Sequence, residues 1–295
     1  MGAQYFTDLE VTKFNAMLDA KEQQTQSKLK PLCKMLQPLV NAEDMAYDGS
    51  DQIEPQRANE SNPDLQFKDM NWSRRQVTTE RIVTAVLYDK KDVNNVLADV
   101  QGTLAEGVHY GHERECDRVI YDRMFADVRT GKKFAGTLTY ANDGGESIDA
   151  TQGLTYETLD NINSRFLDTD IDISGGTYMG VTGDEVESLM HELELTSGDF
   201  TRQNVVDQGT ITRAAGHYLI TYGANVVNPI LEIENSERIS FCLVRGAMAF
   251  TMRKSREVNV YPHPLKVDSM IVKVVEEIGA VRTRGTRIKR MRFTP

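Results

Sequence analysis

The stretch LADVQGTLAEGVHYGHERECDRVIYDRMFADVRTGK, residues 97–132, is the longest part of the chain that lacks proline and is compatible with one helix. Its apolar residues recur at steps of three and four and, after a gap, continue in the same stripe: Leu97, Val100, Leu104, Val108, Cys116, Ile120, Met124 and Val128. A helix of about thirty residues is ~45 Å long at ~1.5 Å per residue. The pattern therefore predicts a helix that crosses a whole face of the subunit.

The second half of this helix is rich in charges of both signs. They are Glu113, Arg114, Glu115, Asp117, Arg118, Asp122, Arg123 and Asp127. Arg118 and Asp122 form an i,i+4 pair, which contributes a few tenths of a kcal/mol when solvated. So many mixed charges favour a solvent-facing or inter-subunit surface over a buried core. We therefore include Arg114 and Arg118 among the candidate inter-subunit contacts.

The bulk composition limits the function. The chain has 295 residues, enough for one large or two ordinary domains, and a net charge of -10, which argues against nucleic-acid binding as the main activity. Three scattered cysteines fit a reducing cytoplasm better than a disulfide framework. No apolar run approaches the ~18 residues of a membrane span, and the N-terminus lacks the pattern of a signal peptide.

The first seventy residues change character along the chain. Residues 7–21 begin with a capping-box pattern and predict a helix, and leucines at 29–39 predict a second short one. Residues 41–69 contain eight acids, two cations and two prolines, with few apolar side chains. We expect this segment to be an extended arm that does not fold by itself.

Residues 71–92 turn to β character. The part NWSRRQVTTE is polar and alternating, and IVTAVLY is nearly continuously apolar, as in a strand that begins in solvent and ends in a core. Trp72, the sole tryptophan, lies beside Arg74 and Arg75. Tryptophan and arginine dominate interface hot spots, so an inter-subunit contact is about as probable as a surface tryptophan packed under arginines.

The rest of the chain predicts a mixture of strands and short helices. Strands are expected at 134–140, 177–181, 217–222, 226–233, 239–244, 248–252, 270–278 and 280–293, helices at 156–166 and from 182, and turns at 142–145 and Gly279. No fixed repeat is visible. The fold class predicted is therefore α+β.

No catalytic, metal or cofactor motif stands out. His191 and Glu192 begin like a zinc-protease helix, but the second histidine is missing. His109 and His112 lie at i and i+3, yet no further histidine or cysteine joins them. Neither a phosphate-binding glycine loop nor a nucleophile elbow is present. We expect no catalytic residues, no metal and no cofactor.

The C-terminal end carries the one strong basic cluster, Arg282, Arg284, Arg287, Lys289, Arg290 and Arg292. Clustered cations suit phosphate contacts, but they equally suit acidic neighbours such as residues 43–69. The acidic balance of the chain favours protein contacts, and we include Arg287 and Arg290 among the candidate inter-subunit residues.

From Phe67 to the end, this order of parts resembles the major capsid proteins of tailed bacteriophages, which have the Hong-Kong-ninety-seven-type fold. The features that carry the resemblance are NWSRRQVTTERIVTAVLYDKKDV, the helix ending HERECDRVIYDRMFADVRTGK, the strand FAGTLTY, the helix GLTYETLDNI and the terminal GAVRTRGTRIKRMRF. The resemblance implies an N-terminal arm at 1–66, an E-loop hairpin at 67–92, a P-domain with its spine helix at 93–172, an inserted A-domain at 173–256 and returning P-domain strands at 257–295.

The resemblance further implies a structural protein, not an enzyme, that self-assembles into pentamers and hexamers of an icosahedral shell around phage DNA. Its partners would be itself, with scaffolding, decoration and portal proteins, packaged DNA only non-specifically, and no membrane. It would be assembled in the host bacterial cytoplasm and end in the virion capsid. Two alternatives stay open: an encapsulin-like compartment shell that binds cargo enzymes, and an α+β enzyme for which no site can be named.

Overall fold

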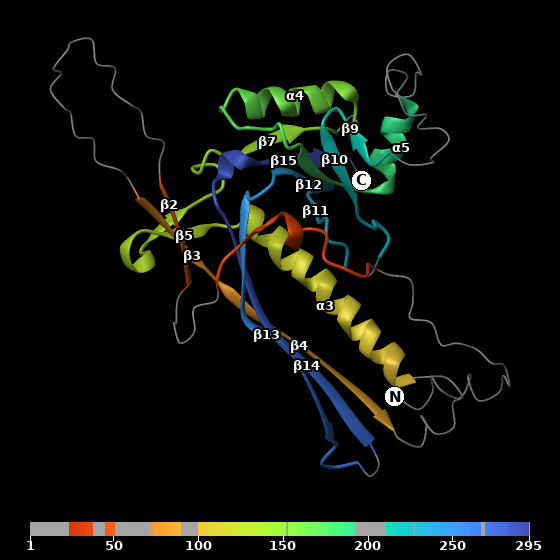
Figure 1. The fold of residues 1–295 in the computed structure, drawn as a ribbon. Coiled ribbons are helices and arrows are strands. Elements are labelled where there is room, and N and C mark those ends of the chain that lie inside the picture. The colour runs from red at the N-terminus through yellow and green to blue at the C-terminus, as the bar shows by residue number, and fades with distance from the viewer. Residues whose placement is uncertain are drawn as a thin grey trace. The chain divides into compact units, whose positions relative to one another are not determined.

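The computed structural model describes residues 24–37, 45–50, 72–89, 100–151, 153–192, 211–226, 228–266 and 269–294. The chain divides into two compact units. Unit 1 comprises Met1–Val40, Thr79–Asp122 and Phe250–Ala280, and unit 2 comprises Asn41–Thr78, Arg123–Ala249 and Val281–Pro295. Both helices and sheets are present, so the α+β expectation is confirmed (Figure 1).

Unit 1 is built on a four-stranded sheet in the order β1-β13-β14-β4. The bounds are β1 Lys34–Met35, β4 Thr79–Asp89, β13 Met248–Pro262 and β14 Ser269–Arg282. β14 pairs antiparallel with β4 from Ser269 opposite Asp89 to Gly279 opposite Thr79. The turn predicted at Gly279 is therefore wrong, because the apolar run continues through this glycine to Arg282; the bend comes later, at η3 Gly285–Arg287.

The long helix is confirmed as α3, Val100–Phe125, which runs alongside β4 and β14 (Figure 1). Cys116, Ile120 and Met124 of the predicted stripe are buried. The helix is shorter than expected at its C-terminal end, since Val128 is buried on strand β5 instead.

Glu113 and Asp117 of the helix face inward, which corrects the expectation of a solvent-facing or inter-subunit surface for these two charges. Arg256 of β13 donates to Glu113 of α3 at 3.0 Å and to Glu276 of β14 at 3.2 Å. Buried His112 lies 2.8 Å from the same Glu276. These contacts join the helix to the sheet, and the charges of Glu113, Arg256 and Glu276 each have a partner from another element, as buried charges require.

Asp117 of α3 is fully buried and organises the segment 24–37, here called the strap. Its carboxylate accepts hydrogen bonds from the backbone N–H groups of Lys28 and Leu29, both at 3.0 Å, and from the side chains of Gln24 and Ser27, both at 2.5 Å. No cation neutralises it directly among these donors, so the strap itself solvates the buried charge.

The prediction of a second helix at 29–39 is wrong, because the segment forms other secondary structure. The strap forms only the 3-10 turn η1 Lys30–Leu32, with Pro31 near its start, and then β1, while the N–H of Leu36 donates to the carbonyl of Phe250. After the 3-10 turn, the strap adds β1 to the edge of the sheet instead of continuing as a helix. The helix predicted for 7–21 lies outside the described residues.

Unit 2 contains two sheets. The larger has the order β7-β15-β12-β8-β10-β9, with β11 paired to β12, and the smaller has the order β2-β3-β5-β6. The larger sheet comprises β7 Glu146–Asp149, β8 Thr177–Val181, β9 Arg213–Ala214, β10 His217–Thr221, β11 Ile233–Glu234, β12 Glu237–Val244 and β15 Ile288–Phe293. The smaller comprises β2 Met45–Ser50, β3 Trp72–Val77, β5 Val128–Thr130 and β6 Gly136–Leu138, with η2 Lys132–Phe134 between β5 and β6.

Two predicted helices are confirmed in unit 2. Thr155 caps α4, Tyr156–Leu167, and the predicted capping box of Thr182 and Glu185 starts α5, Gly183–His191. α4 buries Leu159, Ile162 and Phe166 in the core of the larger sheet (Figure 1). Most predicted strands are also present, but the one expected at 226–233 is reduced to β11.

The strand pairing differs from the expected domain map at two places. β3 and β4 do not form one hairpin: β3 pairs antiparallel with β2, and β4 pairs with β14. The reason is local, since the single residue Thr78 separates them and no turn-forming glycine or asparagine is present. The last strand, β15, pairs with β12 and β7 in the larger sheet of unit 2. The domain boundaries themselves stay a prediction.

Part of the acidic segment 41–69 is ordered, since Met45–Ser50 forms β2; its remainder lies outside the described residues. Among the helices that the structure describes, none combines the length and the apolar character needed to cross a bilayer.

We predict that Asp117→Asn destabilises unit 1 and releases the strap. Hydrogen bonds to a charged group contribute about 1.5–3 kcal/mol each in the net, so the loss of this acceptor lowers the free energy of unfolding by about 2–4 kcal/mol. Chemical denaturation measures the loss of stability, and trypsin cleavage after Lys28 and Lys34 measures the release of the strap. Glu115→Gln is the control, because Glu115 pairs with half-exposed Arg118; a strap as protected as in the parent contradicts the assignment.

Candidate inter-subunit surface

A buried ion cluster holds the smaller sheet of unit 2 in place. Asp143 accepts two hydrogen bonds from Arg75 of β3, at 2.6 and 2.7 Å, and one from Arg282 of β14, at 2.8 Å. The guanidinium of Arg282 also donates to the carbonyls of Ala126 and Leu138. One carboxylate thus neutralises part of two buried cations, and the carbonyls of Ala126 and Leu138 accept from the rest of the Arg282 guanidinium.

The turn that carries Asp143 depends on its two glycines. Gly144 has φ +77°, the left-handed region that glycine adopts without strain, and a Cβ at Gly145 would lie 2.4 Å from the ring of Tyr140. The hydroxyl of Tyr140 contacts the carbonyls of Glu146 and Ile288. The predicted turn at 142–145 is confirmed, and its function is to present one carboxylate to two arginines.

The three candidates on β3 separate into two groups. Trp72 is 68 % exposed, and Arg74 pairs with Asp48 across the β2–β3 ladder at the surface, at 2.7 Å, which lowers the pKa of Asp48 through their hydrogen bond. Arg75 points to the opposite face and is buried inside its own unit. Because strand neighbours alternate in direction, Trp72 and Arg74 share the outer face and Arg75 does not.

The candidates on α3 are less exposed than the sequence suggested. Arg118 pairs with Glu115 at 3.0 Å, and Arg114 is half-buried. An exposed i,i+3 pair contributes little to stability. Their assignment to an inter-subunit contact stays a prediction.

The terminal basic cluster is largely neutralised within its own chain. Lys289 pairs with Glu146, Arg290 with Glu234 and Arg292 with Glu237. Arg287 donates to the carbonyls of Arg245 and Gly246. The cluster that looks most suited to an external acidic partner in sequence thus meets carboxylates and carbonyls of the same subunit.

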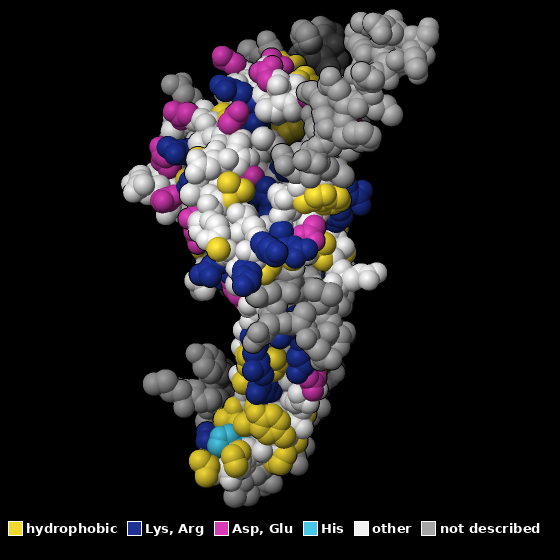
Figure 2. Space-filling model, turned by 90° about the vertical axis from the view of Figure 1, so that its left-hand side faces the viewer, with side chains coloured by type: hydrophobic (Ala, Val, Ile, Leu, Met, Phe, Trp, Pro, Cys, Tyr) yellow, Lys and Arg dark blue, Asp and Glu magenta, His cyan; other side chains and the backbone are white. Residues whose placement is uncertain are grey.

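An apolar tip on unit 1 was missed in the sequence. The antiparallel ribbon of β13 and β14 exposes Val258, Val260 and Tyr261 at the end of β13 and Leu265 in the turn, at 40–89 %. Figure 2 shows hydrophobic side chains gathered around a histidine at this end of the ribbon. Apolar and polar residues alternate in EVNVYP, which is the sequence feature that corresponds to this tip. The same alternation is typical of any exposed strand, so it does not predict an apolar tip. Contiguous exposed apolar residues of this kind mark association surfaces.

A cysteine–histidine pair in the core of unit 2 resembles a nucleophilic dyad but lacks its chemistry. The sulfur of Cys242 lies 3.6 Å from Nδ1 of His217, and both side chains are fully buried. His217 also meets Thr177 and the carbonyl of Leu159, and burial lowers the pKa of its imidazole. Burial raises the pKa of the Cys242 thiol to about 12, so the reactive thiolate is scarce at neutral pH.

Within the described residues, no group of three or more histidine, cysteine, aspartate or glutamate side chains is arranged to hold a metal ion. The candidate sites are two surfaces: the outer face of β3 with Trp72 and Arg74, and the apolar tip of the β13–β14 ribbon.

The model of the phage capsid protein family matches residues 7–294, almost the whole chain. The chain belongs to the phage capsid protein family. No curated protein sequence matches this capsid protein.

Solved capsid structures share its fold. The capsid of cyanophage P-SCSP1u has a TM-score of 0.70 at 10% identity, over 97% of this chain and 94% of that one. The mature capsid of bacteriophage PhiM1 has a TM-score of 0.68 at 12% identity, over 96% and 92%. A Mycobacterium phage Che8 structure has a TM-score of 0.67 at 12% identity, over 95% and 96%. The tailed-phage capsid fold predicted from the sequence is confirmed.

The major capsid function predicted from the sequence is likewise confirmed, and this protein is a structural component of a virion capsid. The encapsulin-like alternative is not favoured, because both the family and the structures cited are of phage capsids.

We predict that the buried thiols of this capsid protein resist alkylation. Burial raises the pKa values of Cys116 and Cys242 to about 12, so below that pH the folded protein holds them as unreactive thiols. With iodoacetamide at pH 8, mass spectrometry should find these cysteines unmodified in the native protein and modified in guanidinium. Rapid native labelling of Cys242 would contradict its placement.

Proposed function

We propose that this capsid protein builds an icosahedral shell of pentamers and hexamers around phage DNA through two surfaces: the apolar tip of the β13–β14 ribbon and the outer face of β3. The apolar tip carries the proposal. Leu265 is 89 % exposed, so it and its apolar neighbours contribute little to the stability of a monomer. Their burial against another subunit would contribute about 25 cal/mol per Å² of apolar area removed from water.

The acidic balance of the chain supports a shell that holds DNA without specific contacts. A net charge of -10 disfavours a strongly cationic inner wall, which would retain phosphates. We place assembly in the host cytoplasm and include scaffolding, decoration and portal proteins as partners, on the family resemblance.

We expect Val260→Glu with Leu265→Glu to abolish shells and leave the subunit folded. Two charges on the apolar tip must be desolvated to form the contact, which is unfavourable by several kcal/mol per contact. Electron microscopy and sedimentation of the purified protein measure particle yield, and Lys266→Gln is the matched control beside the patch. Normal shells from the double variant would remove the tip from the assembly contacts.

Loss of Trp72 and Arg74 should weaken the capsomer without unfolding the chain. Truncation of hot-spot side chains of these types costs roughly 2 kcal/mol or more at an interface. Particle yield of Trp72→Ala with Arg74→Ala is the measurement. Asp48→Asn, which breaks the in-chain pair and keeps both side chains, serves as control; equal losses in the two variants would mean that only the in-chain pair matters.

A further inference from the structure

The segment from β5 to β6 carries cations that have no ionic partner among the described residues. Residues 128–142 contain Arg129, Lys132 and Lys133 and no acid. All three side chains are exposed, and in the described part of the chain none makes an ion pair. This contrasts with the terminal basic cluster of the same unit, where Lys289, Arg290 and Arg292 each pair with a carboxylate.

The backbone of this cationic turn has an uncommon conformation that hydrogen bonds hold in place. Gly131, Lys133 and Phe134 have φ values of 87°, 67° and 53°, in the left-handed region. Non-glycine residues persist there only where the surroundings hold them, and such strain concentrates at functional surfaces. Here the N–H of Gly131 donates to the carbonyl of Arg74 at 3.0 Å, and that of Phe134 donates to the carbonyl of Gly131 at 3.1 Å.

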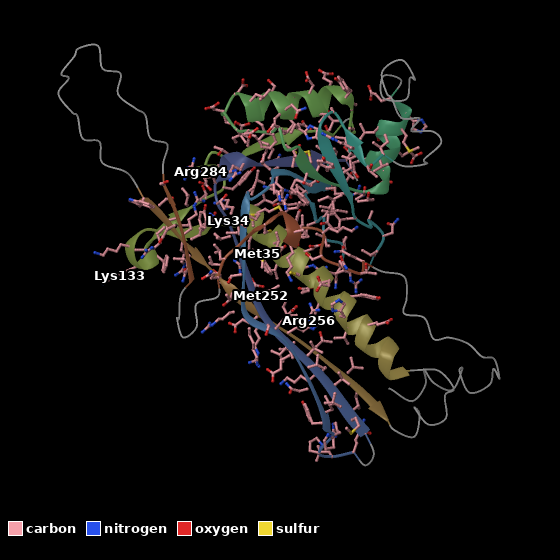
Figure 3. All side chains as sticks on the ribbon, viewed as in Figure 1. Lys34, Met35, Lys133, Met252, Arg256 and Arg284 are labelled. Atoms are coloured by element: carbon pink, nitrogen blue, oxygen red, sulfur yellow. The ribbon has the colours of Figure 1, made fainter. Side chains whose placement is uncertain are left out.

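The bond from Gly131 to Arg74 attaches the turn to β3 near Trp72. Arg75 is opposite Thr130 in an antiparallel ladder, so the turn that follows Thr130 lies toward the start of β3. Figure 3 shows Lys133 pointing away from the strands at the outer end of the turn. Two lysines and the exposed Trp72 thus belong to one end of the smaller sheet.

The chain itself contains an acidic segment of matching charge. Residues 51–71 hold five acids and two cations, a net charge of -3, and connect Ser50 to Trp72, which are opposite each other in the β2–β3 ladder. A segment of 21 residues spans at most ~70 Å when extended, so with both ends at one place it reaches up to ~35 Å. That length is sufficient to cross to a neighbouring subunit.

We propose that the cationic turn, with Trp72 beside it, is the docking surface for the acidic segment 51–71 of a second copy of this chain. The inference rests on the proposed shell function and names the partner of its β3 surface. Each chain then carries both a basic and an acidic surface, and complementary surfaces of this heterologous kind close identical subunits into rings. Charge complementarity fixes which neighbour binds and steers the encounter.

Charge reversal tests the pairing. Variant A is Lys132→Glu with Lys133→Glu, variant B is Glu60→Lys with Asp64→Lys, and variant C combines all four changes in one chain. In DNA-free assembly at low salt, A and B alone should each lose at least ~10-fold in particle yield, because like charges across an interface cost several kcal/mol. Variant C should recover it, and an equimolar mixture of A and B should restore association into even-numbered rings such as hexamers, because a ring of five cannot alternate A with B.

The mixture distinguishes docking between two chains from docking within one chain. In the mixture each A turn meets a B segment of opposite charge, so recovery requires contact between chains. Recovery in C without association of A with B in the mixture would place the segment on its own turn and overturn the proposal. Loss in A alone, confined to assembly with DNA present, would assign the turn to nucleic acid and overturn it too.

Two controls complete the test. Glu157→Lys with Asp160→Lys on exposed positions of α4 reverses the same number of charges and should leave yield unchanged. Sedimentation of A with B, against A and B alone, reports pairing even without shells. If the parent forms no shells but A and B associate, the proposed function fails and the pairing stands; if they do not associate, the pairing fails.

Discussion

The carboxylate of Asp143 is the interaction on which the geometry of unit 2 depends. It lies between the guanidiniums of Arg75 and Arg282, and all three side chains are at least nine-tenths buried. Removing one partner of such a cluster leaves an uncompensated buried charge, which costs about 3–5 kcal/mol. Because Arg75 is on β3, this cluster also fixes the opposite face of that strand, where Trp72 and Arg74 are presented to solvent. A surface that must meet identical copies in a shell needs this rigidity.

Many charged residues of this capsid protein take part in contacts within their own unit, and others stay exposed. Cations of β15 and acids of α3 form ion pairs and hydrogen bonds within their own units. Examples are the pair of Lys289 with Glu146 and the hydrogen bonds from the strap to Asp117. The surfaces that we propose for association are of other kinds: an apolar ribbon tip with Leu265, and a turn with Lys132 and Lys133. Each proposed contact is modest alone, but in the proposed shell each subunit makes both, and the shell repeats them in every copy.

The sequence predicts those elements whose cause is local. Periodicity locates α3, and capping residues locate the start of α4 at Thr155 and of α5 at Thr182. It does not predict that Asp117 is buried, because its donors lie up to 93 residues away along the chain. Nor does it distinguish Arg75, held by Asp143, from exposed Arg74 one position earlier. Of the candidate site, Trp72 and Arg74 were predicted, whereas the cationic turn gains meaning only once the terminal cations are seen to be paired.

A double-mutant cycle on Asp143 and Arg282 tests the central claim most directly. The single variants Asp143→Asn and Arg282→Gln and their combination are compared with the parent by guanidinium unfolding of the subunit. The account predicts that the two losses are strongly non-additive, with a coupling free energy of about 1.5 kcal/mol or more, because both variants disrupt one buried cluster. Losses that add within about 0.5 kcal/mol would contradict it, since they would show that the carboxylate and the guanidinium stabilise the subunit independently.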